Sequence, residues 1–256
     1  MFRVCGSDTS SGISWQEKIA FITQNFWGFF LASILAGAFI GFGILLSFTV
    51  GGLLKESNSS KLAMGSVFGI ALSLVVIAGA ELFTGNNFVL GVGLLRRSVT
   101  WRAASKLWLW CWLGNAVGAI LLAIGFHYSG LQTGAVAQVL AAATVTKMSL
   151  GIVPLILRGI LCNMLVCLAI WSGFQCKSEA GKLIMIFWCL LAFFTTGFEH
   201  SVANMTVLTA GLLDSASSAI TISGWFYNLF WVTLGNMIGG ILFVAYPYVK
   251  MAQKLE

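Results

Sequence analysis

Two short polar segments, each inside a long apolar run, contain the side chains of this 256-residue chain that are best suited to bind or protonate a solute. The first is AGAELFTGNN at 78–87 and the second is TGFEHSVANM at 196–205. Both read G-x-E-x-x-x-x-N, and their glutamates lie 118 residues apart. A charge placed in hydrocarbon costs about 2.5–3.5 kcal/mol even on insertion scales. A doubled polar interruption of this kind indicates a transport pathway.

His200 is the side chain of the second segment that can donate a hydrogen bond and exchange a proton near neutral pH. A lone buried histidine is usually structural, but its place inside the interruption favours a role in the pathway. Glu81 and Glu199 would repel an anion, so we expect them to accept bonds from backbone amides and to orient the segments. Glutamates lining the pathway would instead indicate a cation route. Asn86 and Asn204 are expected to satisfy backbone groups freed by the interruptions.

The composition excludes an ordinary water-soluble domain. Hydrophobic residues make up 59% of the chain and charged residues 9%, whereas charged residues are about a quarter of a typical soluble domain. The excess basic residues are scattered at the ends of apolar segments, which argues against a nucleic-acid partner. Six cysteines lack C-x-x-C spacing and flanking histidines, so neither a disulfide framework nor a metal site is indicated. We therefore expect an integral protein of the lipid bilayer without metal or cofactor.

Six apolar stretches are long enough to cross the hydrocarbon, which takes about 20 residues. They lie near 26–54, 61–95, 101–127, 148–174, 181–213 and 222–249. The second and fifth are longer than needed and contain the two polar segments, as in helices that are broken within the membrane. The sequence predicts an all-α membrane protein with six transmembrane helices, of which helices 2 and 5 are broken at the midplane.

A second repeated motif extends the internal similarity. LGNAVGAIL at 113–121 matches LGNMIGGIL at 234–242. Three spans in each half reverse the second copy, so we expect two inverted three-helix repeats, about 26–127 and 148–249, within a single channel domain at 1–256. The glycines of this motif are expected to allow close helix packing.

Inversion also predicts where the broken helices meet. Their second halves both begin near the midplane, with Thr84 and Ser201 as suitable N-caps. The free N–H groups and positive dipole ends of these half-helices favour an anion at the centre.

The charges at the span ends predict the orientation. Ten lysines and arginines, Lys18 among them, fall on one side against three on the other, which places both termini in the cytoplasm. Residues 1–25 are expected to include a short interfacial helix that starts at a Ser14–Glu17 capping box, and 129–146 is expected to be flexible. Arg158 lies within the fourth span, where a bond to backbone carbonyls or to a neighbouring subunit is favoured over a pathway role.

The chain resembles the formate/nitrite transporter family in AELFTGN at 80–86, CNMLVCLAIW at 162–171 and GFEHSVANM at 197–205. The resemblance covers essentially all six spans, and the last two segments are most similar in sequence to the nitrite and hydrosulfide branches of the family. It implies an aquaporin-like protomer, a homopentamer, and passage of formate, nitrite or hydrosulfide through each protomer of an inner or plasma membrane.

The resemblance also assigns residues. The family's central histidine falls on His200, its break-loop threonine on Thr84, its vestibule lysine on Lys147 and its pore-side asparagine on Asn163. Its apolar constrictions fall on Phe68, Leu72, Leu82, Phe83, Val166 and Phe193. On this reading Lys147 concentrates anions, the constrictions strip water from them, and a proton supplied through His200 lets them cross as neutral acids.

Two other classes remain as alternatives. A neutral-solute pore of the aquaporin or glycerol-facilitator class also has six spans and inverted halves, but Asn-Pro-Ala boxes are absent and Pro154 and Pro247 lie away from the breaks. A membrane enzyme is less favoured, because there is no H-E-x-x-H motif, aspartate pair or Gly-rich loop with a lysine. The residues leave open which small anion passes, and whether the protein is a passive channel or a proton-coupled transporter.

Overall fold

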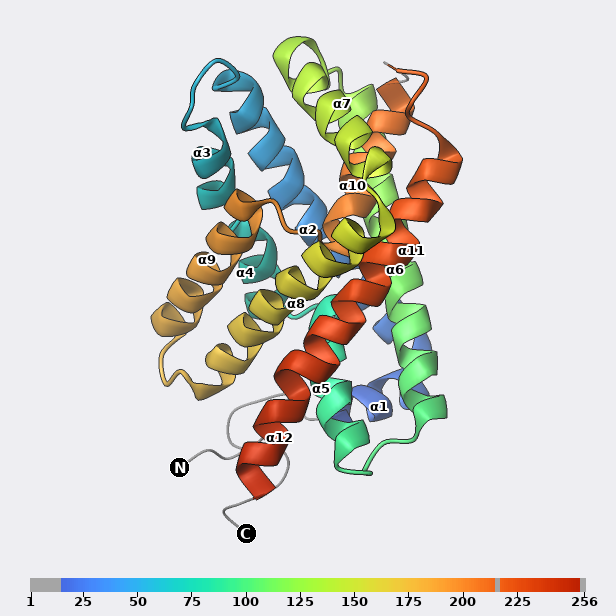
Figure 1. The fold of residues 1–256 in the computed structure, drawn as a ribbon. Coiled ribbons are helices and arrows are strands. Elements are labelled where there is room, and N and C mark those ends of the chain that lie inside the picture. Colours follow the sequence, from blue (N-terminus) through green and yellow to red (C-terminus); the bar gives the residue numbers. More distant parts are fainter. Residues whose placement is uncertain (1–14, 215–216, 254–256) are drawn as a thin grey trace.

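The computed structural model describes residues 15–214 and 217–253, and within these ranges every regular element is a helix (Figure 1). The helices are α1 (Trp15–Gln24), α2 (Phe26–Leu53), α3 (Ser60–Val67), α4 (Ile70–Ile77), α5 (Phe83–Leu95), α6 (Trp101–Tyr128), α7 (Gly134–Ser149), α8 (Ile152–Gln175), α9 (Glu179–Thr196), α10 (Ser201–Asp214), α11 (Ile222–Gly240), η1 (Ile241–Ala245) and α12 (Tyr246–Gln253). In the described part of the chain, six apolar helical segments are long enough to cross a membrane. Four of them coincide with the predicted spans within a few residues, whereas the second and fifth end at the breaks and the rest of each predicted span is a separate helix, α5 or α10. This confirms the predicted fold class.

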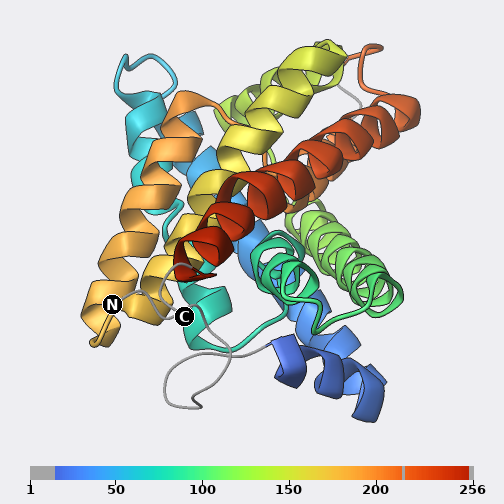
Figure 2. The same ribbon diagram turned by 60° about the horizontal axis from the view of Figure 1, so that its bottom comes forward.

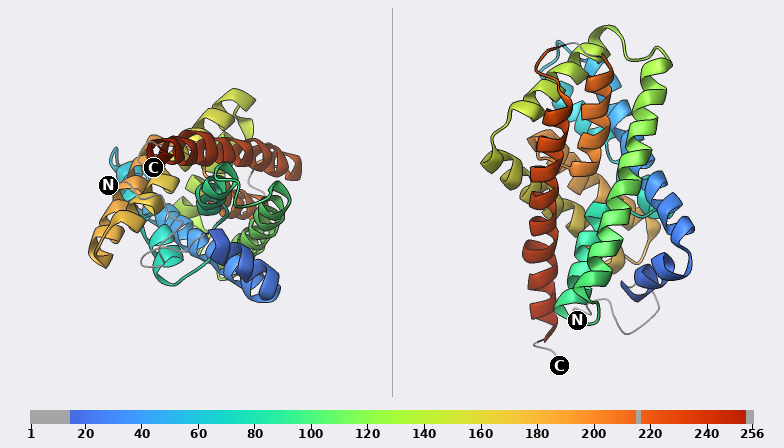
Figure 3. Two further views of the ribbon diagram at one scale, coloured as in Figure 1. Left: turned by 90° about the horizontal axis from the view of Figure 1, so that it is seen from below. Right: turned by 90° about the vertical axis from the view of Figure 1, so that its right-hand side faces the viewer.

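The second and fifth spans are both broken, as predicted. Helices α3 and α4 cross part of the bundle, the chain then leaves the helix, and α5 continues; α9 and α10 repeat this arrangement. Gly79 and Gly197 lie just after α4 and α9 with φ of 74° and 81°, a left-handed conformation that glycine adopts without strain. From the two breaks, α5 and α10 run to opposite ends of the molecule (Figure 1). Viewed from below, α5 is surrounded by the long helices (Figure 3).

The two halves meet at equivalent positions. Trp112 of α6 and Thr233 of α11 are 121 residues apart, the same offset as the L-G-N motifs, and Trp112 Nε1 donates a hydrogen bond to Thr233 Oγ1 at 3.1 Å. Equivalent positions come together only at a twofold axis. The pseudo-twofold axis that relates the inverted repeats therefore passes between these two side chains.

The motif glycines permit close crossings, as the sequence predicts. A Cβ on Gly118 of α6 would overlap the Ile34 carbonyl oxygen of α2, and a Cβ on Gly239 of α11 would overlap the Ile160 carbonyl oxygen of α8. Each half thus has a close crossing between its first and third spans. Without these glycines the helix axes would have to separate.

We expect Gly118→Ala to destabilise the protein by about 1–3 kcal/mol, because the added methyl group forces the α2–α6 crossing apart. The matched control is Gly125→Ala in the same helix, where a Cβ would meet no atom within 4 Å and helix propensity gains about 1 kcal/mol. Thermal unfolding of the purified proteins in detergent measures both. Equal melting temperatures for the two variants would contradict the close-packing role.

The ends of the bundle are covered by α1 and α7. We call them the α1 end and the α7 end; α1 lies across the bundle next to the start of α2 (Figure 2). A helix is present where the short N-terminal helix was predicted, although Ser14 of its capping box is outside the described residues. The expectation that 129–146 is flexible was wrong, because residues 134–149 form α7, which packs against α2, α10 and α11.

Candidate functional site

The two breaks face each other at the centre of the bundle through a buried polar pair. His200 Nε2 lies 3.0 Å from Thr84 Oγ1, and both residues are almost completely buried. The Ala203 backbone N–H donates to His200 Nδ1 at 3.0 Å. Since Nδ1 accepts this bond, a neutral ring has its proton on Nε2 and donates it to the Thr84 oxygen. The Thr84 hydroxyl proton is then free to point at a third partner.

The predicted helix caps were wrong. The helices begin at Phe83 and Ser201, so Thr84 lies within the first turn of α5 and Ser201 is the first residue of α10. The cap of α10 is His200, whose ring nitrogen binds the Ala203 N–H in the way a serine hydroxyl normally would. Among the described residues, the Ser201 hydroxyl has no hydrogen-bond partner.

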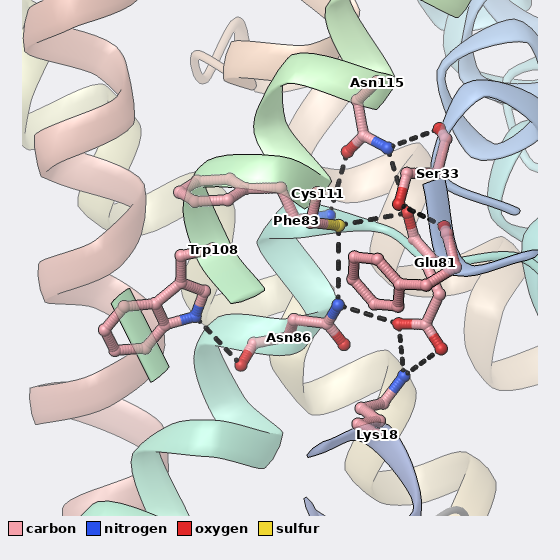
Figure 4. A network of polar contacts seen from close by, with 9 residues as sticks. Lys18, Ser33, Glu81, Phe83, Asn86, Trp108, Cys111 and Asn115 are labelled. Atoms are coloured by element: carbon pink, nitrogen blue, oxygen red, sulfur yellow. Dashed lines mark hydrogen bonds and ion pairs between the residues drawn. The ribbon is translucent and has the colours of Figure 1, made fainter. Parts of the chain in front are cut away.

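Two asparagines that the sequence analysis missed hold the breaks. Asn115 Oδ1 accepts the Phe83 N–H at 2.9 Å, and Asn115 Nδ2 donates to the Glu81 and Ser33 carbonyl oxygens (Figure 4). Asn236 does the same in the other half: its Oδ1 accepts the Ser201 N–H, and its Nδ2 donates to the carbonyl oxygens of Glu199 and Gly159. Their shared place as the third letter of the repeated L-G-N motif was the signal that could have found them.

The break glutamates are held by lysines rather than by backbone amides, which corrects their predicted role. Lys18 Nζ of α1 lies 2.7 and 2.9 Å from the two carboxylate oxygens of Glu81 (Figure 4). Lys147 Nζ of α7 lies 2.9 Å from both carboxylate oxygens of Glu199. Each half therefore neutralises its buried carboxylate with a lysine from the helix that precedes its first span. Lys18 was counted in the sequence only as a topological charge, although it shares a helical face with Trp15.

Asn86 and Asn204 complete these ion pairs. Asn86 Nδ2 donates to Glu81 Oε2 at 2.9 Å and Asn204 Nδ2 donates to Glu199 Oε2 at 2.6 Å. Their predicted bonds to freed backbone groups are replaced by bonds to the carboxylates. The asparagine of each G-x-E-x-x-x-x-N motif thus donates a hydrogen bond to the glutamate of the same motif.

Asn163 lies beside the His200–Thr84 pair, but its side chain is hydrogen-bonded to backbone carbonyl groups. Its Nδ2 donates to the carbonyl oxygens of Asn236 at 2.7 Å and Thr84 at 3.3 Å, and its Oδ1 has no partner among the described residues. The amide therefore fixes the first turn of α5 against α11. Both N–H groups of the Asn163 amide are thus used, and only its Oδ1 acceptor is left to bind another group.

A cavity of about 400 Å³ opens toward the α7 end and reaches the central histidine. Its lining includes Lys147, Phe193 and His200. The Phe193 ring stacks on the His200 ring with centroids 5.8 Å apart, and Phe68 packs edge-on against Phe193 at 5.5 Å. The two phenylalanines assigned to a constriction thus lie together, directly beside the central histidine.

On the α1 side, a cavity of about 110 Å³ is lined by Lys18, Leu82 and Asn86, among others. Leu82 is therefore placed at its wall, whereas Leu72 and Val166 are buried in the core. Phe83 lines a different, apolar hollow between α6 and α11 together with Trp108, and its ring points away from Lys18 (Figure 4). Within the described residues, no three His, Cys, Asp or Glu side chains gather as metal ligands.

A six-span bundle with inverted halves, in which cavities from both ends approach one buried polar pair, defines a membrane channel or transporter. The sequence profile described as "Formate/nitrite transporter" matches residues 15–250. The nitrite transporter NirC of Salmonella typhimurium is 41% identical over 238 residues, which covers 91% of this chain and 86% of the relative. The chain therefore belongs to the formate/nitrite transporter family.

Solved structures agree with this assignment. One described as "FNT family ion channel" is similar with a TM-score of 0.87 and 38% identity over 91% of this chain and 94% of that chain. One described as "Pentameric formate channel with formate bound" has a TM-score of 0.78 and 26% identity, over 90% and 99%. The protein is a multi-pass membrane protein of a family of transporters and channels.

Proposed function

We propose that the protein passes small monovalent anions across the membrane, with nitrite and formate as its substrates and hydrosulfide as a third candidate. The observation that carries the proposal is the His200–Thr84 pair, a buried hydrogen-bond donor system with Phe193 packed against it toward the α7 end and Leu82 at the cavity wall toward the α1 end. The nitrite transporter relative and the formate-bound channel structure support the substrate class.

The donor to a passing anion is the Thr84 hydroxyl. Because His200 Nε2–H donates to the Thr84 oxygen, the threonine proton is left to donate to the anion, and the two bonds polarise each other. Apolar walls on the way remove water from the ion, which raises the value of this one bond. Asn163 supports the site by fixing the backbone at Thr84.

The same chain of bonds provides a route for a proton. For this transfer the ring must first take up a proton at Nδ1, which breaks the bond from the Ala203 N–H and makes His200 an imidazolium. The anion then takes the Thr84 proton while Thr84 takes the Nε2 proton of His200, so the solute crosses the apolar region as its neutral acid and the ring becomes neutral. Nε2 takes up a proton as Nδ1 releases one, which restores the bond from Ala203.

We further propose that the protein lies in the inner or plasma membrane of the cell, with its α1 end facing the cytoplasm. Its single domain at 1–256 divides into repeats at about 26–127 and 148–249. The chain assembles as a homopentamer. The excess of basic residues flanking the spans on the α1 side supports the orientation. The pentameric structural neighbour supports the assembly. On this proposal the protein acts as a transporter and not as an enzyme.

The test is flux into proteoliposomes that contain wild-type protein or His200→Asn. We expect saturable nitrite and formate flux that rises as the pH falls from about 8 to about 5, because the proposed passage takes up one proton with each anion. His200→Asn should reduce the flux about tenfold or more, because one strong hydrogen bond is lost, and it should flatten the pH profile. Glycerol flux without anion flux would contradict the proposal, and an unchanged pH profile in the variant would remove the relay.

A further inference from the structure

The positive charge of the α7-end cavity does not reside on its lysine at the break. Three basic residues and one acidic residue line the cavity: Lys61, Lys147, Arg158 and Glu199. The Lys147 ammonium is bound to both oxygens of Glu199, so this pair contributes little net charge. The remaining positive charge belongs to Lys61 and Arg158. An anion that enters the cavity is therefore attracted mainly by these two side chains.

Arg158 is the better placed of the two to bind an anion. Lys61 is exposed, whereas Arg158 is half-buried in α8, in a cavity whose walls include Phe193 and Phe198. The Arg158 backbone carbonyl accepts the Glu199 N–H at 3.2 Å, which ties this residue to the break beside His200. Burial in apolar surroundings strengthens any charge interaction that the guanidinium makes.

The Arg158 guanidinium lacks a partner within the protein as far as the chain is described. No hydrogen bond or ion pair joins it to another described residue, and the structural bond to backbone carbonyls that the sequence favoured is not formed there. A cation within a membrane-spanning helix is costly unless it is paired. An anion from solution would supply the missing partner.

We propose that Arg158 is an anion-binding site that selects planar anions with two oxygen atoms before they reach the Phe193 ring. This inference rests on the proposed function, because it names the substrate class that the same pathway prefers. The guanidinium presents parallel N–H groups that match two oxygens bidentately, as in its pairs with carboxylates. Formate and nitrite have this shape. Hydrosulfide has one heavy atom and can accept only a single-point contact.

The matched variants separate shape from charge. Arg158→Lys keeps the charge and removes the fork, Arg158→Gln removes the charge, and Lys55→Met removes a lysine that bonds to Gln138 at the same end without lining the cavity. Binding of formate, nitrite and hydrosulfide to each purified protein is measured by calorimetry in detergent. Flux of the same anions into proteoliposomes is measured in parallel. Binding tests the Arg158 site itself, and wild-type flux tests the proposed function, so the two failures are distinguishable.

We expect Arg158→Lys to weaken formate and nitrite binding about tenfold, the value of one lost charge-assisted bond, and to change hydrosulfide binding less than about twofold. Arg158→Gln should weaken all three and make the flux less dependent on salt, while Lys55→Met should match the wild type. Equal losses for all three anions in Arg158→Lys would overturn the selective fork. Unchanged binding in both Arg158 variants would overturn the site altogether.

Discussion

Lys18→Met is expected to lower the stability of the protein by about 3–5 kcal/mol, because it leaves the Glu81 carboxylate buried without its counter-ion. The two side chains are 9% and 7% exposed, so little water reaches the carboxylate to replace the lost ammonium. Asn86 would remain as a partner of Glu81, but an amide does not neutralise a charge. Thermal unfolding in detergent and the yield of folded protein from membranes measure the effect.

Two further variants identify the cause of this loss. Lys18→Met combined with Glu81→Gln removes both charges and should recover most of the lost stability, since a neutral amide in place of the carboxylate has no buried charge to pair. Lys106→Met removes an exposed lysine of α6 and should unfold like the wild type. A double variant as unstable as Lys18→Met alone would show that Lys18 acts through packing of α1 rather than through its charge.

Asn236→Leu is expected to be at least as damaging, with a loss of about 3 kcal/mol or more. One side chain satisfies the Ser201 N–H and two carbonyl oxygens, all in the buried break, at 2.8–2.9 Å. Each backbone group left without a partner costs about 1–3 kcal/mol, and the bilayer offers no water in compensation. The expected result is loss of the folded protein from membranes, or a strongly lowered melting temperature.

Asn87→Leu is the matched control for this prediction. Asn87 is also a fully buried asparagine near a break, but neither atom of its amide has a hydrogen-bond partner among the described residues. Replacing it with leucine removes unpaired polar atoms, so stability should be unchanged or higher. If both asparagine variants unfold alike, the destabilisation comes from shape and not from the hydrogen bonds at the break.

Most of the fold followed from the sequence because hydrocarbon imposes strict requirements on a chain. Span length, the interrupted second and fifth spans and the three-plus-three repeat are consequences of bilayer thickness and backbone hydrogen bonding. The helix α7 did not follow, because sixteen residues of mixed polarity between spans lack both the length and the apolar content of a crossing helix. Its packing against α10 is a tertiary effect that local pattern does not contain.

The sequence predicted most residues of the site, but it did not predict which hydrogen bonds and ion pairs they make. The G-x-E-x-x-x-x-N motif showed which residues interrupt the helices, and the structure brings His200 and Thr84 together as that motif suggested. The partner of each glutamate was missed, because an ion pair between α1 and a break 63 residues later leaves no local signal. The packing role of the glycines in the L-G-N motif was correctly inferred. The hydrogen bonds that Asn115 and Asn236 of the same motif make to the breaks were not.

The contact of Trp112 with Thr233 across the pseudo-twofold axis has a consequence for ancestry and for chemistry. Two identical three-span chains would place the same residue on both sides of that axis, and the position of His200 in one half corresponds to Leu82 in the other. A symmetric dimer would therefore have two imidazoles at its centre or none. Joining the halves in one polypeptide allowed each to change alone, so a single ring could face a threonine from one side. The two ends of the fused chain thus lead to the centre past different residues, which a pore made of identical halves cannot provide.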